Sequence, residues 1–409
     1  MENVSSRCGK SDNAPRLRFP EFSGEWVEKK LGEIFFEVNE RKHPELPVLS
    51  IQQGIGTVFR DISERRISYD KANINAYKVI EPGDFIIHLR SFEGGLECSK
   101  HKGISSPAYK ILRSNCIDSA AFKDYFRSYN FIEGKLAAAV TGIRDGKNID
   151  MPTFWSLKIN IPSLPEQKKI AAFFTLLDRR IQKQRQLVEF LKTYKRGVSE
   201  AIFERRLNFS SLLATEWKKY KLGQIGEFYN GLSGKSREDF GNGNCKFITY
   251  MNVYKNIIAD ESLCESVKIR KEEEQNLVKY GDVLFTQSSE TLEEVGYTSV
   301  WTHSSQPYLN SFCFGYRFYD SVMTNPIFIA HYMRSNYIRK AIMKEGQGAT
   351  RVNLSAERLK NLNIFLPDIN GQNKIAEFLS RLENRIHKEE SVLEKMSTEK
   401  SSLLQKMFF

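Results

Sequence analysis

The amino-acid sequence predicts an α+β protein in which two similar domains with mixed sheets are separated by two long antiparallel coiled-coil helices. Three observations predict this class: a segment that occurs twice, two long stretches with heptad spacing of apolar residues, and short β-rich runs between loops. The chain has 409 residues, which is enough for roughly two or three domains with their own cores.

The duplication is clearest where each long helix is expected to begin. The segment 161–171 (IPSLPEQKKIA) is echoed by 366–376 (LPDINGQNKIA), and Trp26 before a Leu-Gly run is matched by Trp217 before another. A globular segment followed by a helix is therefore the repeating unit. We expect a first domain over 1–160 with 1–14 disordered, a long helix over 161–208, a second domain over 209–365 and a C-terminal long helix over 366–409.

Both expected helices carry apolar residues at alternating steps of four and three, which is the a and d spacing of a coiled coil. From Ile170 and from Ile375 onward, glycine and proline are absent from both helices, apart from Gly197, which lies off the apolar stripe. Such stripes usually pack into a core, and here we expect the two to bury each other as an antiparallel pair. The seam residues are Ile170, Phe174, Leu177, Ile181, Val188 and Leu191 in the first helix and Ile375, Leu379, Leu382, Ile386, Leu393 and Met396 in the second.

Polar residues interrupt both seams and suggest two registers. One register places Lys195 opposite Glu389, which would give each charge a partner. The other is shifted by one heptad, overlaps more fully and places Lys195 opposite Leu382. The first is the preferred hypothesis.

The globular segments show short strands and fewer helices. Strand-forming runs occupy 84–89, 282–286 and 311–318, and helical patterns occupy 120–136 and 326–343. Strands and helices do not alternate regularly, so we expect an irregular sheet with a few packed helices in each domain.

The charge indicates a polyanionic partner without proving one. The formal net charge is +11 and the isoelectric point is about 9.2, which favours nucleic acid over a membrane surface. Most of the excess lies in the first helix, where Arg179, Arg180, Lys183, Arg185, Lys192 and Arg196 form either a solvated face or a binding surface. The N-terminal residues lack an apolar core, no apolar run is long enough to span a bilayer, and a cytoplasmic location is expected.

Motifs for catalysis are absent from the sequence. The segment 231–236 (GLSGKS) ends like a phosphate-binding loop, but Tyr229 stands where the first glycine is required. No HExxH helix, G-x-S-x-G elbow or Asn-Pro-Pro-aromatic tetrad occurs, and the six histidines and six cysteines have no metal-ligand spacing. We therefore expect a non-catalytic binding protein with no catalytic residues, metal site or bound cofactor of its own.

The helix starts, the opening segment 15–22 (PRLRFPEF) before Trp26, and the runs 89–95 (LRSFEGG) and 281–291 (GDVLFTQSSET) together resemble the specificity subunit of type I restriction-modification systems. The resemblance spans essentially the whole chain. One departure is that the second helix start has Asn-Gly-Gln at 370–372, where the first has Pro-Glu-Gln. This difference suggests a looser second start.

The resemblance implies that each globular segment is a target-recognition domain for one half of a split, asymmetric DNA sequence. The coiled coil would set the spacer between the halves and dock methyltransferase subunits. The implied partners are double-stranded DNA, two methyltransferase (modification) subunits and two restriction subunits, with S-adenosylmethionine, ATP and Mg on those subunits and no membrane. Two alternatives are a coiled-coil scaffold joining two protein-binding modules and a related system that cuts near its site.

Base contacts are expected from loop residues, because Arg and Lys suit guanine whereas Asn and Gln suit adenine. For each residue the alternative is an ordinary solvated loop. The DNA-binding candidates are Arg90, Ser91, Lys100, Lys102, Arg144, Lys147 and Asn148 in the first domain, and Lys235, Arg237, Gln287, Ser288, Ser289, Arg351 and Asn353 in the second. The aromatic residues Phe92, Tyr109 and Tyr308 are expected to be core residues rather than stacking surfaces.

Overall fold

The computed structural model describes residues 14–60, 71–142, 147–207, 216–348 and 350–409. The chain forms two compact units, the first comprising 1–186 with 391–409 and the second 187–390, so each long helix contributes to both units. The predicted disordered segment lies outside the described residues, except for Ala14. Among the described residues, no helix is long and apolar enough to cross a membrane.

The first unit is built around a four-stranded antiparallel sheet in the order β2-β9-β6-β7. Three two-stranded pairings, β1-β12, β3-β4 and β5-β8, surround it, and a β10-β11 hairpin lies near its end in the chain. The elements are β1 (Val27–Lys30), α1 (Leu31–Ile34), β2 (Phe36–Val38), β3 (Leu49–Gln52), β4 (Gly56–Phe59), β5 (Lys78–Ile80), β6 (Phe85–Ile87), α2 (Ser91–Gly94), β7 (Glu97–Cys98), β8 (Gly103–Ser105), β9 (Lys110–Arg113), α3 (Ser119–Phe122), α4 (Tyr129–Ile132), β10 (Val140–Thr141), β11 (Asn148–Ile149), α5 (Met151–Ser156) and β12 (Lys158–Ile161).

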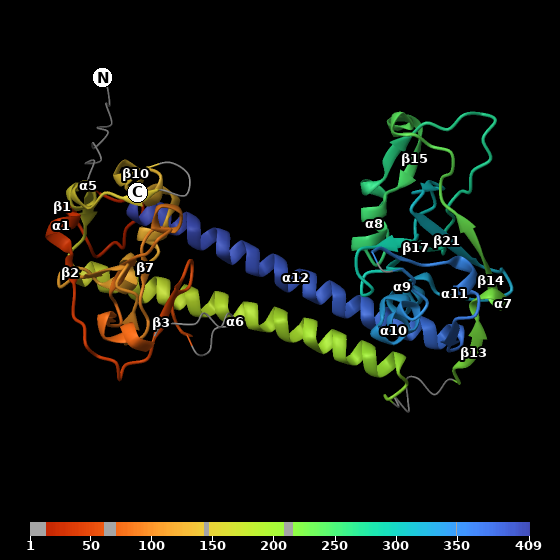
Figure 1. The fold of residues 1–409 in the computed structure, drawn as a ribbon, viewed down its shortest axis with the longest axis horizontal. Coiled ribbons are helices and arrows are strands. Elements are labelled where there is room, and N and C mark those ends of the chain that lie inside the picture. The colour runs from red at the N-terminus through yellow and green to blue at the C-terminus, as the bar shows by residue number, and fades with distance from the viewer. Residues whose placement is uncertain (1–13, 61–70, 143–146, 208–215, 349) are drawn as a thin grey trace, which may run out of the picture. The chain divides into compact units, whose positions relative to one another are not determined.

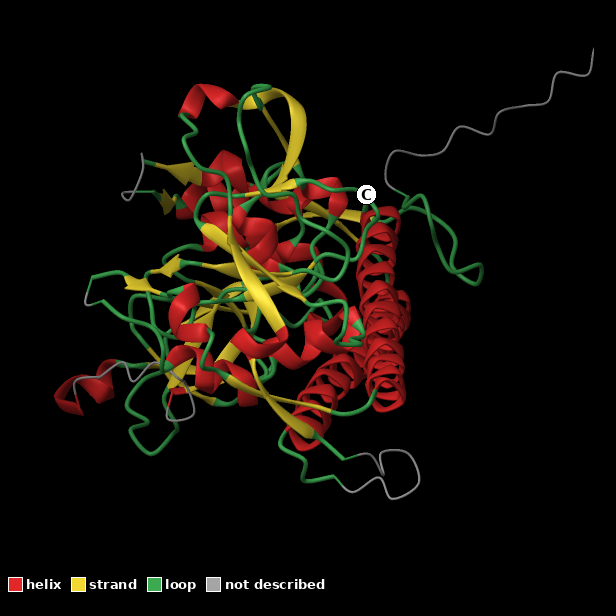
Figure 2. Cartoon of the chain, turned by 90° about the vertical axis from the view of Figure 1, so that its right-hand side faces the viewer, coloured by secondary structure: helices red, strands yellow, loops and turns green. Residues whose placement is uncertain are grey.

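The second unit repeats this plan with the sheet β14-β21-β17-β19 and adds a three-stranded sheet, β16-β15-β20, in which β15 and β20 are parallel. Apart from β15, the strands are short, and long loops connect the elements (Figure 2). The elements are β13 (Lys218–Lys221), α7 (Leu222–Ile225), β14 (Gly226–Asn230), β15 (Phe240–Ile248), α8 (Tyr250–Lys255), β16 (Glu265–Val267), β17 (Val283–Thr286), β18 (Ser288–Ser289), β19 (Thr298–Val300), β20 (Tyr308–Leu309), β21 (Cys313–Phe318), α9 (Pro326–Arg334), α10 (Asn336–Met343), β22 (Val352–Asn353), α11 (Ala356–Leu359) and β23 (Asn363–Leu366).

The predicted α+β class is confirmed, although one helical expectation differs. The strand runs contain β6, β17 and β21, and the pattern over 326–343 becomes α9 and α10, divided where the Ser335 side chain caps the second helix. The pattern over 120–136 is instead broken into short pieces, because Ser128 leaves the helical conformation and caps α4.

The duplication extends to buried polar contacts within each unit. In the first unit Arg113 forms a bidentate pair with buried Asp84, with nitrogen–oxygen distances of 2.7 and 2.8 Å. In the second unit Arg317 and Asp282 form the same pair at 2.9 and 2.7 Å. Each aspartate follows a glycine with positive φ in the turn before the central strand, so the same ion pair ties this turn to the neighbouring strand in both units.

A buried glutamine fixes the start of each long helix. The Gln167 side chain accepts a hydrogen bond from the Asp118 backbone N–H at 2.7 Å and donates to the Pro162 carbonyl at 3.0 Å. Gln372 repeats both bonds with Asn325 and Pro367. The local repeat in the sequence therefore corresponds to a repeated tertiary contact.

The two helix starts differ where the sequence differs. In the first, Glu166 is buried and accepts two hydrogen bonds from Arg18, both at 2.7 Å. In the second, Gly371 takes this position, and its backbone N–H donates to the Asp368 carboxylate at 2.7 Å. The second start has thus exchanged a side-chain ion pair for a local cap.

The long helices α6 (Leu164–Phe203) and α12 (Ile369–Phe408) each span 40 residues. Every seam residue named above is buried or half-buried, whereas most residues on the other faces are exposed. In the first unit the last turns of α12 lie against the domain, close to the marked C-terminus (Figure 1).

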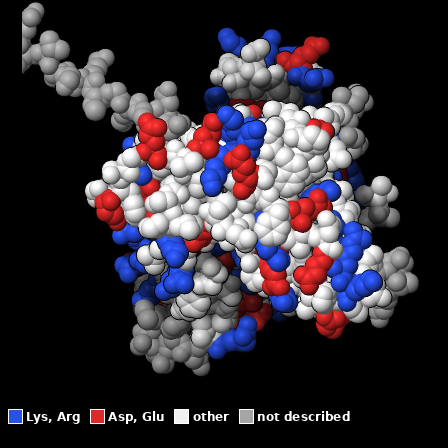
Figure 3. Space-filling view, turned by 90° about the vertical axis from the view of Figure 1, so that its left-hand side faces the viewer, with Lys and Arg blue, Asp and Glu red and all other residues white. Residues whose placement is uncertain are grey.

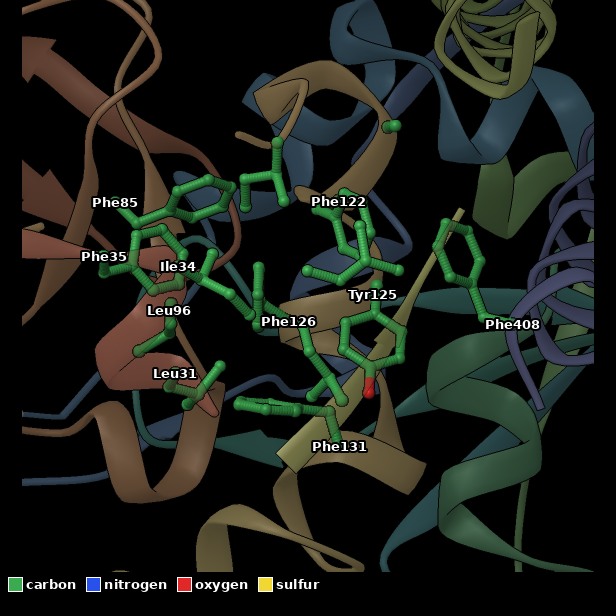
Figure 4. Close-up of a cluster of buried hydrophobic side chains, with 14 of the residues drawn as sticks. Leu31, Ile34, Phe35, Phe85, Leu96, Phe122, Tyr125, Phe126, Phe131 and Phe408 are labelled. Atoms are coloured by element: carbon green, nitrogen blue, oxygen red, sulfur yellow. The ribbon is translucent and has the colours of Figure 1, made fainter. Parts of the chain in front are cut away.

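The core of the first unit includes the end of the chain. Phe408 packs against Phe122 and Tyr125, with ring centroids 5.4 and 5.2 Å away, and Figure 4 shows this ring facing the aromatic cluster. Ile170 and Phe174 from the start of α6 belong to the same core. In the second unit the opposite ends of the helices, including Phe203 and Leu379, join the core in the same way.

The antiparallel pairing is therefore present inside each unit, but in the register that the sequence did not favour. In the second unit Lys195 Nζ lies 2.9 Å from Glu383 Oε1, beside Leu382. In the first unit Lys400 Nζ lies 2.6 Å from Asp178 Oδ1. The preferred register, with Lys195 opposite Glu389, is therefore wrong. Lys195 pairs with Glu383, which is the neighbour of the seam residue Leu382, and this pairing agrees with the alternative register.

Candidate nucleic-acid interface

In the second unit, a two-stranded ribbon brings together candidates that lie far apart in the sequence. Strand β18 pairs with β22, so that Ser288 is opposite Asn353 and Ser289 is opposite Val352. Gln287 directly precedes β18, and Arg351 directly precedes β22. A two-stranded ribbon is one of the elements that the major groove of B-DNA admits.

The ribbon candidates differ in what they present to solvent. The side chains of Gln287, Arg351 and Asn353 are exposed. The Ser289 side chain is buried, and its hydroxyl donates to the Thr291 carbonyl at 2.6 Å. Gln287, Arg351 and Asn353 therefore present polar side-chain groups to solvent, whereas Ser289 does not.

The other two candidates of this unit lie near the β15-β16 sheet. The Lys235 side chain is 2% exposed, and its ammonium group donates to the Lys268 carbonyl at 2.7 Å and pairs with Glu273. This ammonium group is occupied within the unit, which argues against a DNA contact by Lys235. Arg237 is exposed in a 3₁₀ turn over Arg237–Asp239.

In the first unit, the β10-β11 hairpin lies beside α2. Lys147 Nζ is 5.7 Å from the centroid of the Phe92 ring, and Lys147, Asn148 and Arg90 are exposed. Ser91 is fully buried, and its hydroxyl accepts a hydrogen bond from the His88 backbone N–H at 2.8 Å, so it shapes the turn before α2. The structure thus groups Arg90 with Lys147 and Asn148.

Lys100 and Lys102 belong to a different part of the first unit, the turn between β7 and β8. Lys102 Nζ lies 2.7 Å from Glu81 Oε1, and this hydrogen bond raises the pKa of Lys102. Lys100 is exposed, and its backbone N–H donates to Thr57 Oγ1 at 3.1 Å. Arg144 lies outside the described residues.

The β3-β4 hairpin of the first unit was not among the candidates predicted from the sequence. Its tip carries the exposed residues Gln53 and Ile55, and the Gly54 backbone N–H donates to the buried carboxylate of Glu97 at 2.7 Å. A Cβ atom on Gly94 of α2 would lie only 2.7 Å from the Gln53 side chain, so the tip touches the α2 turn. The glycine-rich turn at 53–56 signals a hairpin in the sequence, but only the fold places it beside α2.

Charges on the face of the first unit in Figure 3 are mixed, with Lys and Arg interspersed among Asp and Glu. On α6, Arg179, Arg180 and Lys183 are exposed, and no hydrogen bond or ion pair joins their side chains to another described residue. Lys192 differs, because it lies 2.9 Å from Glu390. Arg185 and Arg196 are also exposed, and no ion pair joins them to another described residue, so the uncompensated charge of the first helix extends from Arg179 to Arg196.

Within the described part of the chain, His, Cys, Asp and Glu side chains form no cluster suited to a metal ion. The burial of Cys313 raises the pKa of its thiol, and burial likewise raises the pKa of Cys98 to about 11 and that of Cys264 to about 11. Thiols with raised pKa values are poor nucleophiles at neutral pH. Cys98, Cys264 and Cys313 are therefore poor candidates for a nucleophile.

A duplicated pair of small-sheet domains, each ending in a long helix and presenting polar hairpins, defines a two-module binding protein suited to DNA. Comparison of the sequence with those of known protein families identifies the family within this class. The sequence model of the family described as "Type I restriction modification DNA specificity domain" matches residues 115–191 and 214–395, and the chain belongs to this family.

Several known proteins are similar over nearly the full length. The type I restriction enzyme MjaVIII specificity subunit of Methanocaldococcus jannaschii is 22% identical, over 95% of this chain and 93% of that protein. The crystal structure of the HsdS subunit from Thermoanaerobacter tengcongensis has a TM-score of 0.53 and 18% identity, covering 94% of this chain and 96% of that one. A chain from a solved type I R-M system has a TM-score of 0.59 and 18% identity, covering 94% and 97%. These structures share the fold.

Proposed function

We propose that this chain is the DNA-reading subunit of a type I restriction-modification complex and that each unit reads one half of a split, asymmetric sequence. The observation that carries the proposal is the duplication itself. The two units share the Asp–Arg pair and the glutamine at the helix start, yet their exposed loops differ. Two related scaffolds with different loops suit two different half-sites on one DNA molecule.

Recognition in each unit is assigned to a hairpin or ribbon. In the first unit the readers would be Arg90, Lys147 and Asn148 with the Gln53 hairpin, and in the second Gln287, Arg351 and Asn353. Amide side chains can bond both polar atoms on the adenine edge, whereas a guanidinium can bond both acceptors of guanine. Exposed basic residues such as Arg179 and Lys183 would add phosphate contacts that strengthen binding without selecting sequence.

Catalysis is assigned to partners. Two methyltransferase subunits would methylate adenine with S-adenosylmethionine, and two restriction subunits would use ATP and Mg; the complex would work in the cytoplasm. The base to be methylated would be extruded by the methyltransferase, not by this chain. A scaffold that binds no DNA is disfavoured by the family match.

The outer side of α6 offers a surface for the methyltransferase subunits. Phe190 and Tyr194 are 64% and 46% exposed, and their rings stack with centroids 6.2 Å apart. Exposed aromatic pairs of this kind are common anchors of protein interfaces. A Phe190→Ala/Tyr194→Ala variant should lose co-purification with the methyltransferase subunits, whereas an Arg381→Ala variant on α12 should retain it.

The function is tested by expressing the chain with its methyltransferase subunits in a host that lacks adenine methylation. Genome-wide mapping of methylated adenine should reveal one split asymmetric motif with a fixed spacer, and the motif should vanish when this chain is omitted. A stable complex that methylates no defined motif would contradict the proposal.

A further inference from the structure

In the second unit, a groove of about 360 Å³ runs beside the β18-β22 ribbon. Its walls come from α8, from β18 and the loop that follows it, from the turn before β21 and from Arg351. Because it adjoins Gln287 and Arg351, the groove extends the candidate interface rather than forming a separate site.

The walls of the groove expose two large apolar side chains, one from α8 and one from the turn before β21. Phe312, in the turn before β21, is 64% exposed, and Met251, in α8, is 48% exposed. Exposed apolar side chains gathered at a rim commonly mark a binding surface. Their occupant must present an apolar group of its own.

Hydrogen bonds hold the walls in place. The Tyr250 hydroxyl donates to the Ser288 carbonyl at 2.6 Å, which ties α8 to the ribbon. The Gln287 backbone N–H donates to the Phe312 carbonyl at 2.9 Å, and the Gln287 carbonyl accepts from the Leu354 N–H at 2.8 Å. Gln287, Phe312 and the ribbon are therefore fixed relative to one another, which lowers the entropy cost of binding.

The charges at the groove favour a base edge over a phosphate. Glu290 and Glu294 line it, and the Tyr254 hydroxyl donates to Glu294 Oε1 at 2.6 Å. Carboxylates repel the DNA backbone, whereas Arg351 can donate to an acceptor on a base. In the major groove, thymine is the base that combines an acceptor, O4, with an apolar group, the C5-methyl.

We propose that this groove reads a thymine in the second half-site, with Phe312 and Met251 contacting the C5-methyl group and Arg351 donating to O4. This inference rests on the proposed function, because it requires the second unit to meet base edges. The inference goes beyond that function by naming the base that is read and the residues that select it.

The test replaces single thymines with deoxyuridine, which lacks only the methyl group. Binding of duplexes to the complex of full-length chain and methyltransferase subunits is measured with thymine or deoxyuridine at each thymine position of the second half-site. At one position, deoxyuridine should weaken binding by the wild-type complex about fourfold, the effect expected for burying one methyl group. Phe312→Ala and Met251→Ala complexes should bind both duplexes at that position with nearly equal affinity.

Tyr280→Ala is the matched control, because Tyr280 is an exposed aromatic residue of the same unit and does not line the groove. This variant should keep the full preference for thymine. The proposal is overturned if wild-type binding is insensitive to deoxyuridine at every thymine position, if the half-site contains no thymine, or if both groove variants keep the preference. It is also overturned if the groove variants lose the methyltransferase subunits, since the groove would then be a protein interface. Failure of the wild-type complex to bind any split motif would instead contradict the proposed function.

Discussion

One difference between the duplicated units lies beside their seam ion pairs, Lys400–Asp178 in the first unit and Lys195–Glu383 in the second. Six residues after the cap of α3 the first unit has Asp124, whose carboxylate lies 2.6 Å from Lys400. Six residues after the cap of α9 the second unit has His331, whose Nε2 lies 3.7 Å from Glu383. The first unit thus surrounds its lysine with two carboxylates, whereas the second unit replaces one of them with a buried imidazole.

The His331 position makes the stability of the second unit pH-dependent. Burial lowers the pKa of His331 to about 4 and outweighs the opposing effect of Glu383. As the pH falls, the His331 imidazole is therefore protonated near pH 6.5 in the unfolded chain but only near pH 4 in the folded unit. The free energy of unfolding should therefore fall by roughly 3 kcal/mol as the pH is lowered from 6.5 to 4, because protonation favours the unfolded chain.

Urea unfolding of the full-length chain at several pH values between 7 and 4 measures this dependence. Hydrogen exchange of the backbone amides in α9 then shows whether the loss of stability lies in the second unit. His331→Gln should flatten the dependence, whereas His303→Gln, a change at a partly exposed histidine of the same unit, should leave it intact. Equal slopes for wild type and His331→Gln would exclude the burial argument.

At the scale of elements, the two seam ion pairs are copies of one contact. Asp178 and Glu383 occupy the same place in the helix repeat, as do Lys195 and Lys400, and each pair joins α6 to α12 within one unit. Burial alone would raise the pKa of Asp178, but hydrogen bonds from Lys123 and Lys400 outweigh it and hold this pKa below its ordinary value. Apolar residues favour pairing of the helices, and these charges help to select the register.

Reversing one charge of a pair should therefore cost stability that reversing both restores. Lys195→Glu should destabilise the second unit by about 1–2 kcal/mol, because the new carboxylate lies next to the carboxylate of Glu383 and repels it. Lys195→Glu/Glu383→Lys should recover most of that loss. Thermal unfolding of the wild type, of the single variants Lys195→Glu and Glu383→Lys and of the double variant forms the cycle, and additive effects of the two single changes would show that the pair makes no net contribution.

At the scale of the whole molecule, the proposed function makes helix length part of DNA recognition. Insertion of one heptad into both α6 and α12, after Gln186 and after Glu390, keeps the seam in phase and adds about 10.5 Å of helix. Mapping of methylated adenine should then show unchanged half-sites with a longer spacer, by at most about three base pairs.

The control for this experiment inserts the heptad into α6 alone, which breaks the pairing of the seams. This variant should lose methylation or assembly. An unchanged spacer after the paired insertion would show that the helices do not set the distance between half-sites.

The amino-acid sequence by itself determined the duplication, the two long helices and their apolar stripes, because these features are periodic and local. It also indicated the family, since the motifs at the helix starts recur in order. Polar contacts such as the Gln167 and Gln372 bonds repeat because the segments that form them repeat.

Only the tertiary structure decided which of the candidate residues meet. The pairing of 288–289 with 352–353, the burial of Ser91 and Ser289, the occupied ammonium of Lys235 and the groove at Phe312 depend on contacts between distant segments. The helix register was decided in the same way, because heptad spacing fixes which face of a helix is buried but leaves the shift along its axis to the charges and domain cores at its ends.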